Sequence, residues 1–196
     1  MTTAQPQRAT NSAARAAKSS GNSTAQDIAL IAVFAAIIIV LGFVSIPVGA
    51  AGVPIVLQNA AVILAGLVLG SRRGFYTAGI FLLVGLALPV LAGGRTVISA
   101  LGGPTVGYLV GYLVSAPVAG AIAYRAPFRS NKGATIGILA VAGFVALFFQ
   151  YLCGVFGLMW RTDMSFGGAW AAQVPFLLPD AGKTVLMIAI AFAVHQ

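Results

Sequence analysis

Long apolar stretches separated by short connections rich in polar residues, Gly or Pro dominate the pattern along the chain. Six stretches have about the length that an α-helix needs to cross the hydrocarbon core of a bilayer, roughly 20 residues. These predicted spans cover residues 28–46, 55–70, 75–91, 104–124, 134–157 and 174–194. The pattern therefore predicts an all-α integral membrane domain with six transmembrane helices.

Composition supports a membrane domain and excludes an ordinary soluble one. Of the 196 residues, 60% are hydrophobic and 7% are charged, and the mean hydropathy is +1.00. A soluble domain carries roughly 25% charged residues. Six spans also use most of the chain, so no room is left for a soluble catalytic or nucleotide-binding domain, and any energy-consuming step has to be supplied by partners.

The first 26 residues differ from the rest of the chain. They are rich in Ala, Ser, Thr, Gln and Asn and contain three basic residues, Arg8, Arg15 and Lys18. Without apolar periodicity, residues 1–26 are expected to form a disordered, basic cytoplasmic tail, and residues 27–196 the six-helix membrane domain. A transit peptide or signal sequence is the alternative, but the apolar run 28–48 exceeds the ~7–15 residues of a signal peptide's apolar core.

The basic residues predict the orientation of the spans. With a cytoplasmic N-terminus, eight of the eleven Lys and Arg residues lie on the inner side, and only Arg95 and Arg161 lie outside. Because short cytoplasmic connections carry the excess of Lys and Arg, both termini are predicted to be cytoplasmic, in a multi-pass protein of a bacterial cell membrane. The net charge of +8 is then explained by the orientation of the spans and by contact of the basic residues with anionic lipid. Nucleic-acid binding is disfavoured because the cations are split among three segments.

Two charged residues fall inside the last predicted span. Asp180 lies about 9 Å from the outer end of this span at 1.5 Å per residue, and Lys183 follows one turn deeper on the same helix face. A charge at the centre of a membrane helix costs about 2.5–3.5 kcal/mol on the insertion scale. Intramembrane charges mark ligand pathways by default, so we expect Asp180 and Lys183 to face a cavity open to the outer side. The alternative is an ion pair that only holds helices together.

Further polar residues are candidates for contact with a bound solute. Arg95 lies in a Gly-rich outer connection, where its guanidinium can bind a carboxylate with two parallel hydrogen bonds, or can simply extend to the interface. Gln58, Tyr108 and Tyr151 lie in or near spans, where each can contact a ligand or bond a neighbouring helix.

The chain lacks the residues of common catalytic and metal sites. It has one His, one Cys and three acidic residues, which excludes an internal disulfide and leaves a zinc site and a Ser-His-Asp triad without their ligands or partners. No catalytic residue, metal or cofactor is therefore predicted, and the chain is not expected to be an enzyme.

Small residues recur at helical spacing. Glycines spaced four apart, such as Gly66/Gly70 and Gly107/Gly111, are typical of close helix packing in lipid. Ala29, Ala32 and Ala36 form a similar stripe on the first span. This stripe is expected either to pack inside the domain or to bind a helix of a partner.

Five short segments together resemble the BioY family, the biotin-binding S components of energy-coupling factor (ECF) transporters. The segments occur in the family's order and read VPIVLQ (53–58), LAGLVLGSRRG (64–74), LPVLAGG (88–94), GGPTVGYLVGY (102–112) and VPFLLPDAGK (174–183). Each segment alone is a weak signal, but their combination over residues 28 to about 192 is specific.

The resemblance implies a function and roles for the candidate residues. A family member has six helices with cytoplasmic termini and binds biotin in a pocket near the outer side. The matching Asp180 and Lys183 would then bind the ureido ring, carboxylate to ring N–H and ammonium to ring carbonyl, and Arg95 the valerate carboxylate. The face of the first helix near Ala29, Ala32 and Ala36 would bind the coupling membrane protein, or T component. A pair of ATPases would drive transport by reorienting the S component.

Three other functions fit parts of the same pattern. The same architecture suits another small anionic or zwitterionic solute, such as another vitamin or an amino acid, because Asp, Lys and Arg complement such a molecule too. An intramembrane enzyme is disfavoured because a second carboxylate facing Asp180 is missing. In a purely structural subunit, the charged pair would only join helices.

Overall fold

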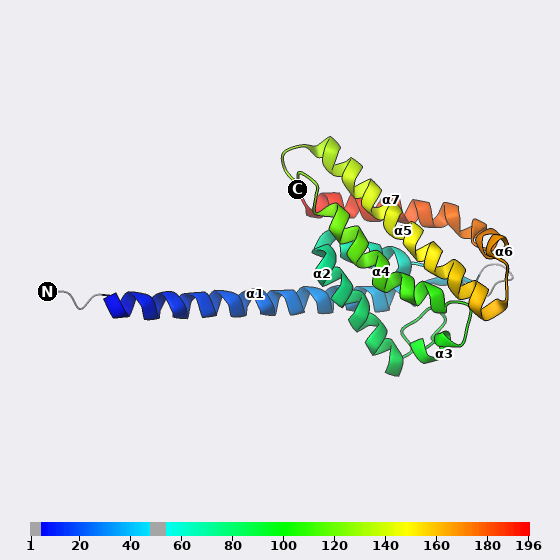
Figure 1. The fold of residues 1–196 in the computed structure, drawn as a ribbon, viewed down its shortest axis with the longest axis horizontal. Coiled ribbons are helices and arrows are strands. Elements are labelled where there is room, and N and C mark those ends of the chain that lie inside the picture. The colour runs from blue at the N-terminus through cyan, green and yellow to red at the C-terminus, as the bar shows by residue number, and fades with distance from the viewer. Residues whose placement is uncertain (1–4, 48–53) are drawn as a thin grey trace.

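The computed structural model describes the backbone of residues 5–47 and 54–196 and the side chains of residues 23–44 and 55–196. This part of the chain is almost entirely helical, as the apolar pattern predicted (Figure 1). Its elements, in chain order, are α1 (Gln5–Leu41), β1 (Ser45–Pro47), β2 (Pro54–Val56), α2 (Gln58–Ala87), α3 (Val97–Leu101), α4 (Val106–Ala123), α5 (Lys132–Thr162), α6 (Phe166–Ala171) and α7 (Val174–Val194).

Among the described residues, five helices are long and apolar enough to cross a membrane, rather than the six predicted. They are Ser23–Leu41 of α1, and α2, α4, α5 and α7. The difference arises in α2, which contains most of the predicted spans 55–70 and 75–91 in one element. The expected connection at residues 71–74 is itself helical, and a single residue, Gly70, has non-helical backbone angles.

Gly70 folds α2 back on itself. Its φ of +83° and ψ of 177° are accessible essentially to glycine alone. The two arms, residues 58–69 and 71–87, approach each other so closely that a Cβ on Gly74 would lie 3.0 Å from the Cα of Gly66. The chain therefore reverses at the single residue Gly70, between two helical arms, instead of in a loop.

α1 is longer than the first predicted span. The predicted tail, residues 1–26, was expected to lack regular structure, but α1 begins at Gln5. The Ala-rich composition explains this difference, because Ala has the highest helix propensity and the segment contains no Pro after residue 6. Residues 1–4 lie outside the described part of the chain.

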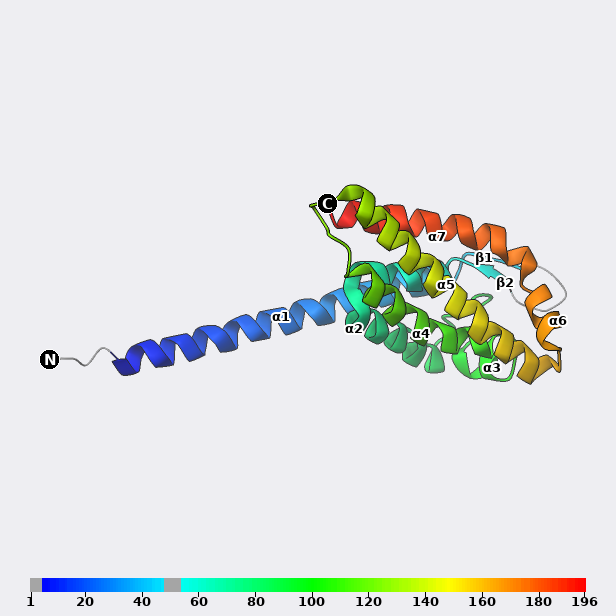
Figure 2. The same cartoon turned by 45° about the horizontal axis from the view of Figure 1, so that its top comes forward.

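Two short strands were not predicted. β1 and β2 form an antiparallel pair with Ile46 opposite Ile55, at the same end of the bundle as α6 (Figure 2). Residues 45–46 and 55–56, predicted as ends of helical spans, therefore belong to strands. Residues 48–53, which include the first residue of the VPIVLQ segment, lie outside the described residues.

Glycine lets the central helices α2, α4 and α5 pack closely. A Cβ on Gly66 of α2 would collide with the backbone of Ala116 in α4, and one on Gly107 of α4 would collide with the backbone of Cys153 in α5. A Cβ on Gly111 would lie 3.0 Å from the Cα of Gln150. The prediction of internal helix packing is confirmed for these three glycines.

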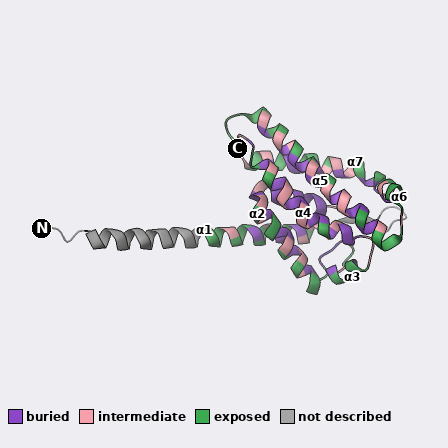
Figure 3. Ribbon diagram, viewed as in Figure 1, coloured by how far each residue is buried: buried purple, intermediate pink, exposed green. Residues whose placement is uncertain are grey.

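Polar and apolar residues are distributed as a membrane requires. Large apolar side chains such as Phe43, Trp160 and Leu178 are exposed, whereas ten polar or charged residues of the described side chains, among them Gln150 and Asp180, are buried. Figure 3 shows exposed residues along the outer faces of α5 and α7 and buried ones where the helices meet. Because lipid offers no hydrogen bonds, the buried polar groups need partners inside the protein.

We expect Gly70→Ala to destabilise the protein by about 1–3 kcal/mol, because alanine at this φ and ψ is strained and its Cβ would lie 3.2 Å from the Tyr124 ring. Thermal unfolding of the detergent-solubilised protein measures the effect. Gly79→Ala is the matched control, since Gly79 lies in the same helix with no atom within 4 Å of its Cβ position. Equal unfolding temperatures for both variants would contradict the role of Gly70.

Candidate functional site

One cavity of about 590 Å³, including space open to solvent, lies between the helices at the end of the bundle that carries α3 and the start of α7. The wall combines apolar residues with a few polar ones, as small-molecule sites do. Its lining residues are Ile55, Val56, Gln58, Asn59, Leu91, Ala92, Arg95, Thr105, Tyr108, Leu109, Tyr112, Tyr151, Phe176 and Asp180.

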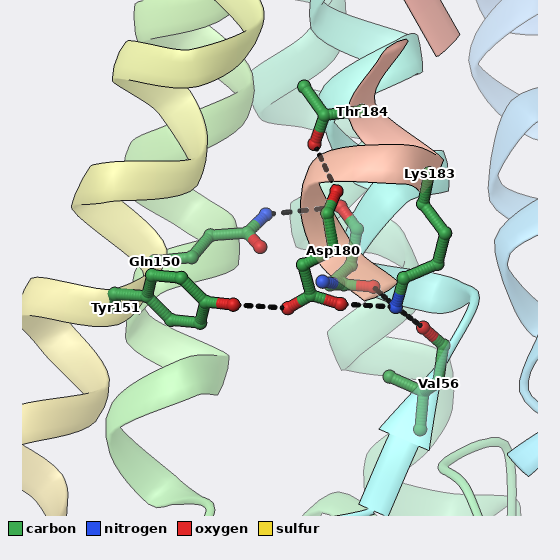
Figure 4. A network of polar contacts seen from close by, with 7 residues as sticks. Val56, Gln150, Tyr151, Asp180, Lys183 and Thr184 are labelled. Atoms are coloured by element: carbon green, nitrogen blue, oxygen red, sulfur yellow. Dashed lines mark hydrogen bonds and ion pairs between the residues drawn. The ribbon is translucent and has the colours of Figure 1, made fainter. Parts of the chain in front are cut away.

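Asp180 supplies the negative charge of this wall. It lies in the second turn of α7 and is 6% exposed. One carboxylate oxygen accepts a hydrogen bond of 2.8 Å from the Tyr151 hydroxyl of α5, and the other forms an ion pair with Lys183 (Figure 4). A carboxylate offers about four lone-pair sites, so Asp180 keeps acceptor capacity for a solute in the cavity.

Lys183 lies behind Asp180 and is not among the lining residues. Besides the ion pair, its Nζ donates to the Val56 carbonyl at 2.6 Å and to Asn59 Oδ1 at 3.1 Å. An ammonium has three N–H groups, so all three have acceptors within the protein. The ammonium thus joins α7 to β2 and to the start of α2, and it compensates the buried carboxylate.

A second layer of hydrogen bonds holds the partners of this pair. Gln150 of α5 is buried and its amide donates to the Asn59 carbonyl at 3.1 Å and to Ser115 Oγ at 2.9 Å. The Gln173 amide donates to the Tyr151 carbonyl at 3.2 Å. Asn59 and Tyr151, which contact Lys183 and Asp180 respectively, are therefore fixed by buried amides from α5 and from the residue preceding α7.

Arg95 supplies a positive charge to the same cavity from the connection between α2 and α3. This connection turns sharply at Gly93 and Gly94, whose φ angles are +74° and +68°. Within the described residues, the one hydrogen bond of the Arg95 side chain runs from Nε to the Ala92 carbonyl at 3.3 Å. Its two terminal NH2 groups keep their donors, so the guanidinium can still bind a carboxylate bidentately.

Comparison with known proteins assigns the chain to a family. Residues 11–196 match the BioY family. The chain belongs to the BioY family. A protein named biotin transporter BioY from Rhodobacter capsulatus is 38% identical over 178 residues, which cover 87% of this chain and 94% of that protein. A Rhizobium etli protein with the same name is 34% identical, with 86% and 92% covered.

A solved structure has the same fold. It is described as the S-component for biotin from an ECF-type ABC transporter, at 2.1 Å, and superposes with a TM-score of 0.78. The match covers 88% of this chain and 92% of that chain at 27% identity. The resemblance of the five sequence segments to the BioY family is thereby confirmed.

Five of the six predicted binding residues of this BioY-family chain line the cavity. Asp180, Arg95, Gln58, Tyr108 and Tyr151 do so, and Lys183 is held behind the wall. Gln58 is the least available to a ligand, since its amide donates to the Ile38 carbonyl at 3.1 Å and the Val90 carbonyl at 2.7 Å. Ligand contact by these six side chains remains a prediction.

Four further residues line the cavity but are not among the six predicted binding residues: Asn59, Thr105, Tyr112 and Phe176. Asn59 and Tyr112 are polar residues within predicted spans, the same signal that pointed to Gln58 and Tyr108. Phe176 and Thr105 carried no such signal, because an aromatic residue and a short hydroxyl side chain at a helix start are common in structural positions.

The alanine stripe of α1 faces away from the bundle. Ala29, Ala32 and Ala36 are exposed, whereas Ala35 and Ile38 are buried on the opposite face of the helix. Internal packing of this stripe, one of the two readings considered for it, is therefore wrong. Binding of a partner helix remains a prediction.

Within the described ranges, no three His, Cys, Asp or Glu side chains are grouped to hold a metal ion.

We expect Lys183→Met to lower the stability of the ligand-free protein by about 3–5 kcal/mol, because it leaves the buried Asp180 carboxylate without its counter-charge. The double variant Asp180→Asn with Lys183→Met should recover much of the loss, since neither charge is then buried. Thermal unfolding in detergent compares them, with the exposed Lys132→Met as control. Wild-type stability of the single variant would show that the ion pair does not stabilise the fold.

Proposed function

We propose that this protein is the S component of an ECF-type importer, a membrane subunit that captures biotin from the outer side and delivers it inward. One observation carries the proposal: a BioY-family chain places a carboxylate and a guanidinium, Asp180 and Arg95, in the wall of one cavity. The names of its relatives, biotin transporter and S-component for biotin, support the choice of ligand.

Biotin's chemistry matches the wall of the cavity. Its ureido ring offers two N–H donors, which the Asp180 carboxylate can accept, and its valerate ends in a carboxylate, which Arg95 can bind. The sulfur-containing ring and the alkyl chain need apolar contacts, and Ile55, Leu91 and Phe176 provide them. For Lys183 to reach the ring carbonyl as well, it would exchange its contact with Val56 or Asn59 for the ligand.

The structure supports the orientation that the basic residues predict. Arg73 pairs with Asp27 of α1 at 2.6 Å, the Tyr124 hydroxyl at the end of α4 donates to the Val68 carbonyl at 2.7 Å, and His195 contacts the Leu67 carbonyl at 3.0 Å. The elbow of α2 therefore meets the ends of α4 and α7 at one end of the bundle, away from the cavity. We propose that this end is cytoplasmic and that the two arms of α2 count as two of six spans.

The proposed partners are a T component and a pair of ATPases. The exposed stripe of Ala29, Ala32 and Ala36 supports contact with the T component, because small residues allow helix backbones to approach closely in lipid. ATP would then be consumed by the partners, and this chain would need no cofactor of its own.

Purification of the tagged protein from its native membrane, followed by identification of the co-purifying chains, should yield both the T component and the ATPases. Recovery of the tagged protein without any other chain would contradict this assembly.

Biotin should stabilise the detergent-solubilised protein against heat, by roughly 2.7 kcal/mol at a hundredfold excess over its dissociation constant. A panel of other vitamins and amino acids, tested in parallel, should produce no comparable shift. Stabilisation by another solute but not by biotin would favour a carrier for that solute, and no shift with any compound would favour a structural subunit.

Asp180→Asn should abolish biotin binding, because the amide offers the ureido N–H groups only one oxygen and no charge. The protein should remain folded, because Lys183 keeps the Val56 carbonyl and Asn59 Oδ1 as acceptors. Equilibrium binding of labelled biotin to purified protein measures the loss. Asp163→Asn is the matched control, since Asp163 is exposed beyond the end of α5. Unchanged affinity in Asp180→Asn would refute the assigned pocket.

A further inference from the structure

Thr105 has a buried hydroxyl group without a hydrogen-bond partner among the described residues. It occupies the N-cap position of α4, where Thr normally accepts a hydrogen bond from the first turn, but its side chain makes no such bond. Thr96, the N-cap of α3, does accept one, from the Ser99 amide. The Thr105 side chain is therefore not needed to cap its helix.

The face of α4 that begins with Thr105 forms part of the cavity wall. Thr105, Tyr108, Leu109 and Tyr112 all line the cavity, and their spacing of three, four and seven residues places them on one face of a helix. Gln173 Oε1, the second buried atom without a partner in the part of the chain whose side chains are described, belongs to a residue outside the wall. The unpartnered hydroxyl of Thr105 is thus associated with the cavity.

A buried hydroxyl without a partner is costly. An unsatisfied buried polar group destabilises a protein by about 1–3 kcal/mol, and such groups in native structures call for an explanation. In a membrane-embedded bundle, lipid cannot supply the missing bond. A ligand atom in the cavity can, since a hydroxyl both donates and accepts.

The surroundings of Thr105 favour a negatively charged ligand atom. The N-terminus of α4, an 18-residue helix, carries a partial positive charge. Arg95 lines the same cavity and comes from the connection that leads into α3 and α4. The carboxylate of Asp180 belongs to another element, α7. The segment 95–105 therefore contributes positive charge and hydrogen-bond donors to the wall, and α7 contributes an acceptor.

We propose that Thr105 is a specificity-determining residue whose hydroxyl donates a hydrogen bond to the carboxylate of the bound ligand, alongside Arg95. This inference rests on the proposed function, in which the ligand is biotin and the carboxylate is that of its valerate chain. Thr105 then selects the carboxylate end of the ligand, while Asp180 selects the ring.

Thr105→Val tests the proposal, because valine has the shape of threonine without the hydroxyl. Its affinity for biotin should fall roughly tenfold or more, as expected for the loss of a hydrogen bond to a charged group. Its unfolding temperature without ligand should stay the same or rise, because the unsatisfied hydroxyl is gone. Thr105→Ser keeps the hydroxyl and should retain most of the affinity.

A biotin analogue that carries a methyl group in place of the carboxylate tests whether Thr105 contacts the carboxylate of the ligand. Thr105→Val should leave the affinity for this analogue unchanged. Thr77→Val is the control for loss of a buried hydroxyl elsewhere, since Thr77 bonds to the Arg73 carbonyl and lies outside the cavity wall, and it should bind biotin like wild type.

Several results would overturn the proposal. Wild-type affinity of Thr105→Val for biotin would show that the hydroxyl makes no contact. Equal losses for biotin and the methyl analogue would place the contact elsewhere on the ligand. A parallel fall in ligand-free stability would make Thr105 structural. These outcomes leave wild-type binding intact, whereas failure of the wild-type protein to bind biotin would reject the proposed function and this inference together.

Discussion

The arrangement of the site depends on how the protein compensates a carboxylate within a membrane-embedded bundle. Asp180 is buried among helices that lipid surrounds, where an isolated charge is unfavourable. Lys183 and Tyr151 compensate it, and Lys183 in turn bonds to the Val56 carbonyl and Asn59. Because these partners come from α5, β2 and α2, neutralising one charge brings together the segments that line the cavity.

The sequence predicted those features of the fold and of the site that depend on residues close together in the chain. Hydropathy located the apolar part of each long helix, because burial in lipid requires apolar side chains along a whole span, although it divided α2 into two spans. The i, i+3 spacing placed Asp180 and Lys183 on one helix face. The spacing did not show that Asp180 faces the cavity and Lys183 faces β2. This difference depends on contacts between residues more than 120 positions apart, such as Lys183 with Val56.

The elements that the sequence did not predict depend on single residues or on tertiary packing. The gap between the predicted spans placed a connection at residues 71–74, whereas the turn is made by the backbone of Gly70 between two helical arms. The β1–β2 pair is three residues long in each strand, too short for a periodic signal. Likewise, the missing cap bond at Thr105 is a geometric property, which no spacing of residue types reveals.

The exposed alanine stripe lies apart from the cavity wall, which has a consequence for the proposed binding of a T component. The outer face of α1 contains Ala29, Ala32 and Ala36, while the wall of the cavity comes mainly from other elements. Gln58 connects the two regions through its hydrogen bond to the Ile38 carbonyl of α1. In the proposed assembly, different residues therefore bind the solute and the T component, and Gln58 is the link through which a change at one surface can reach the other.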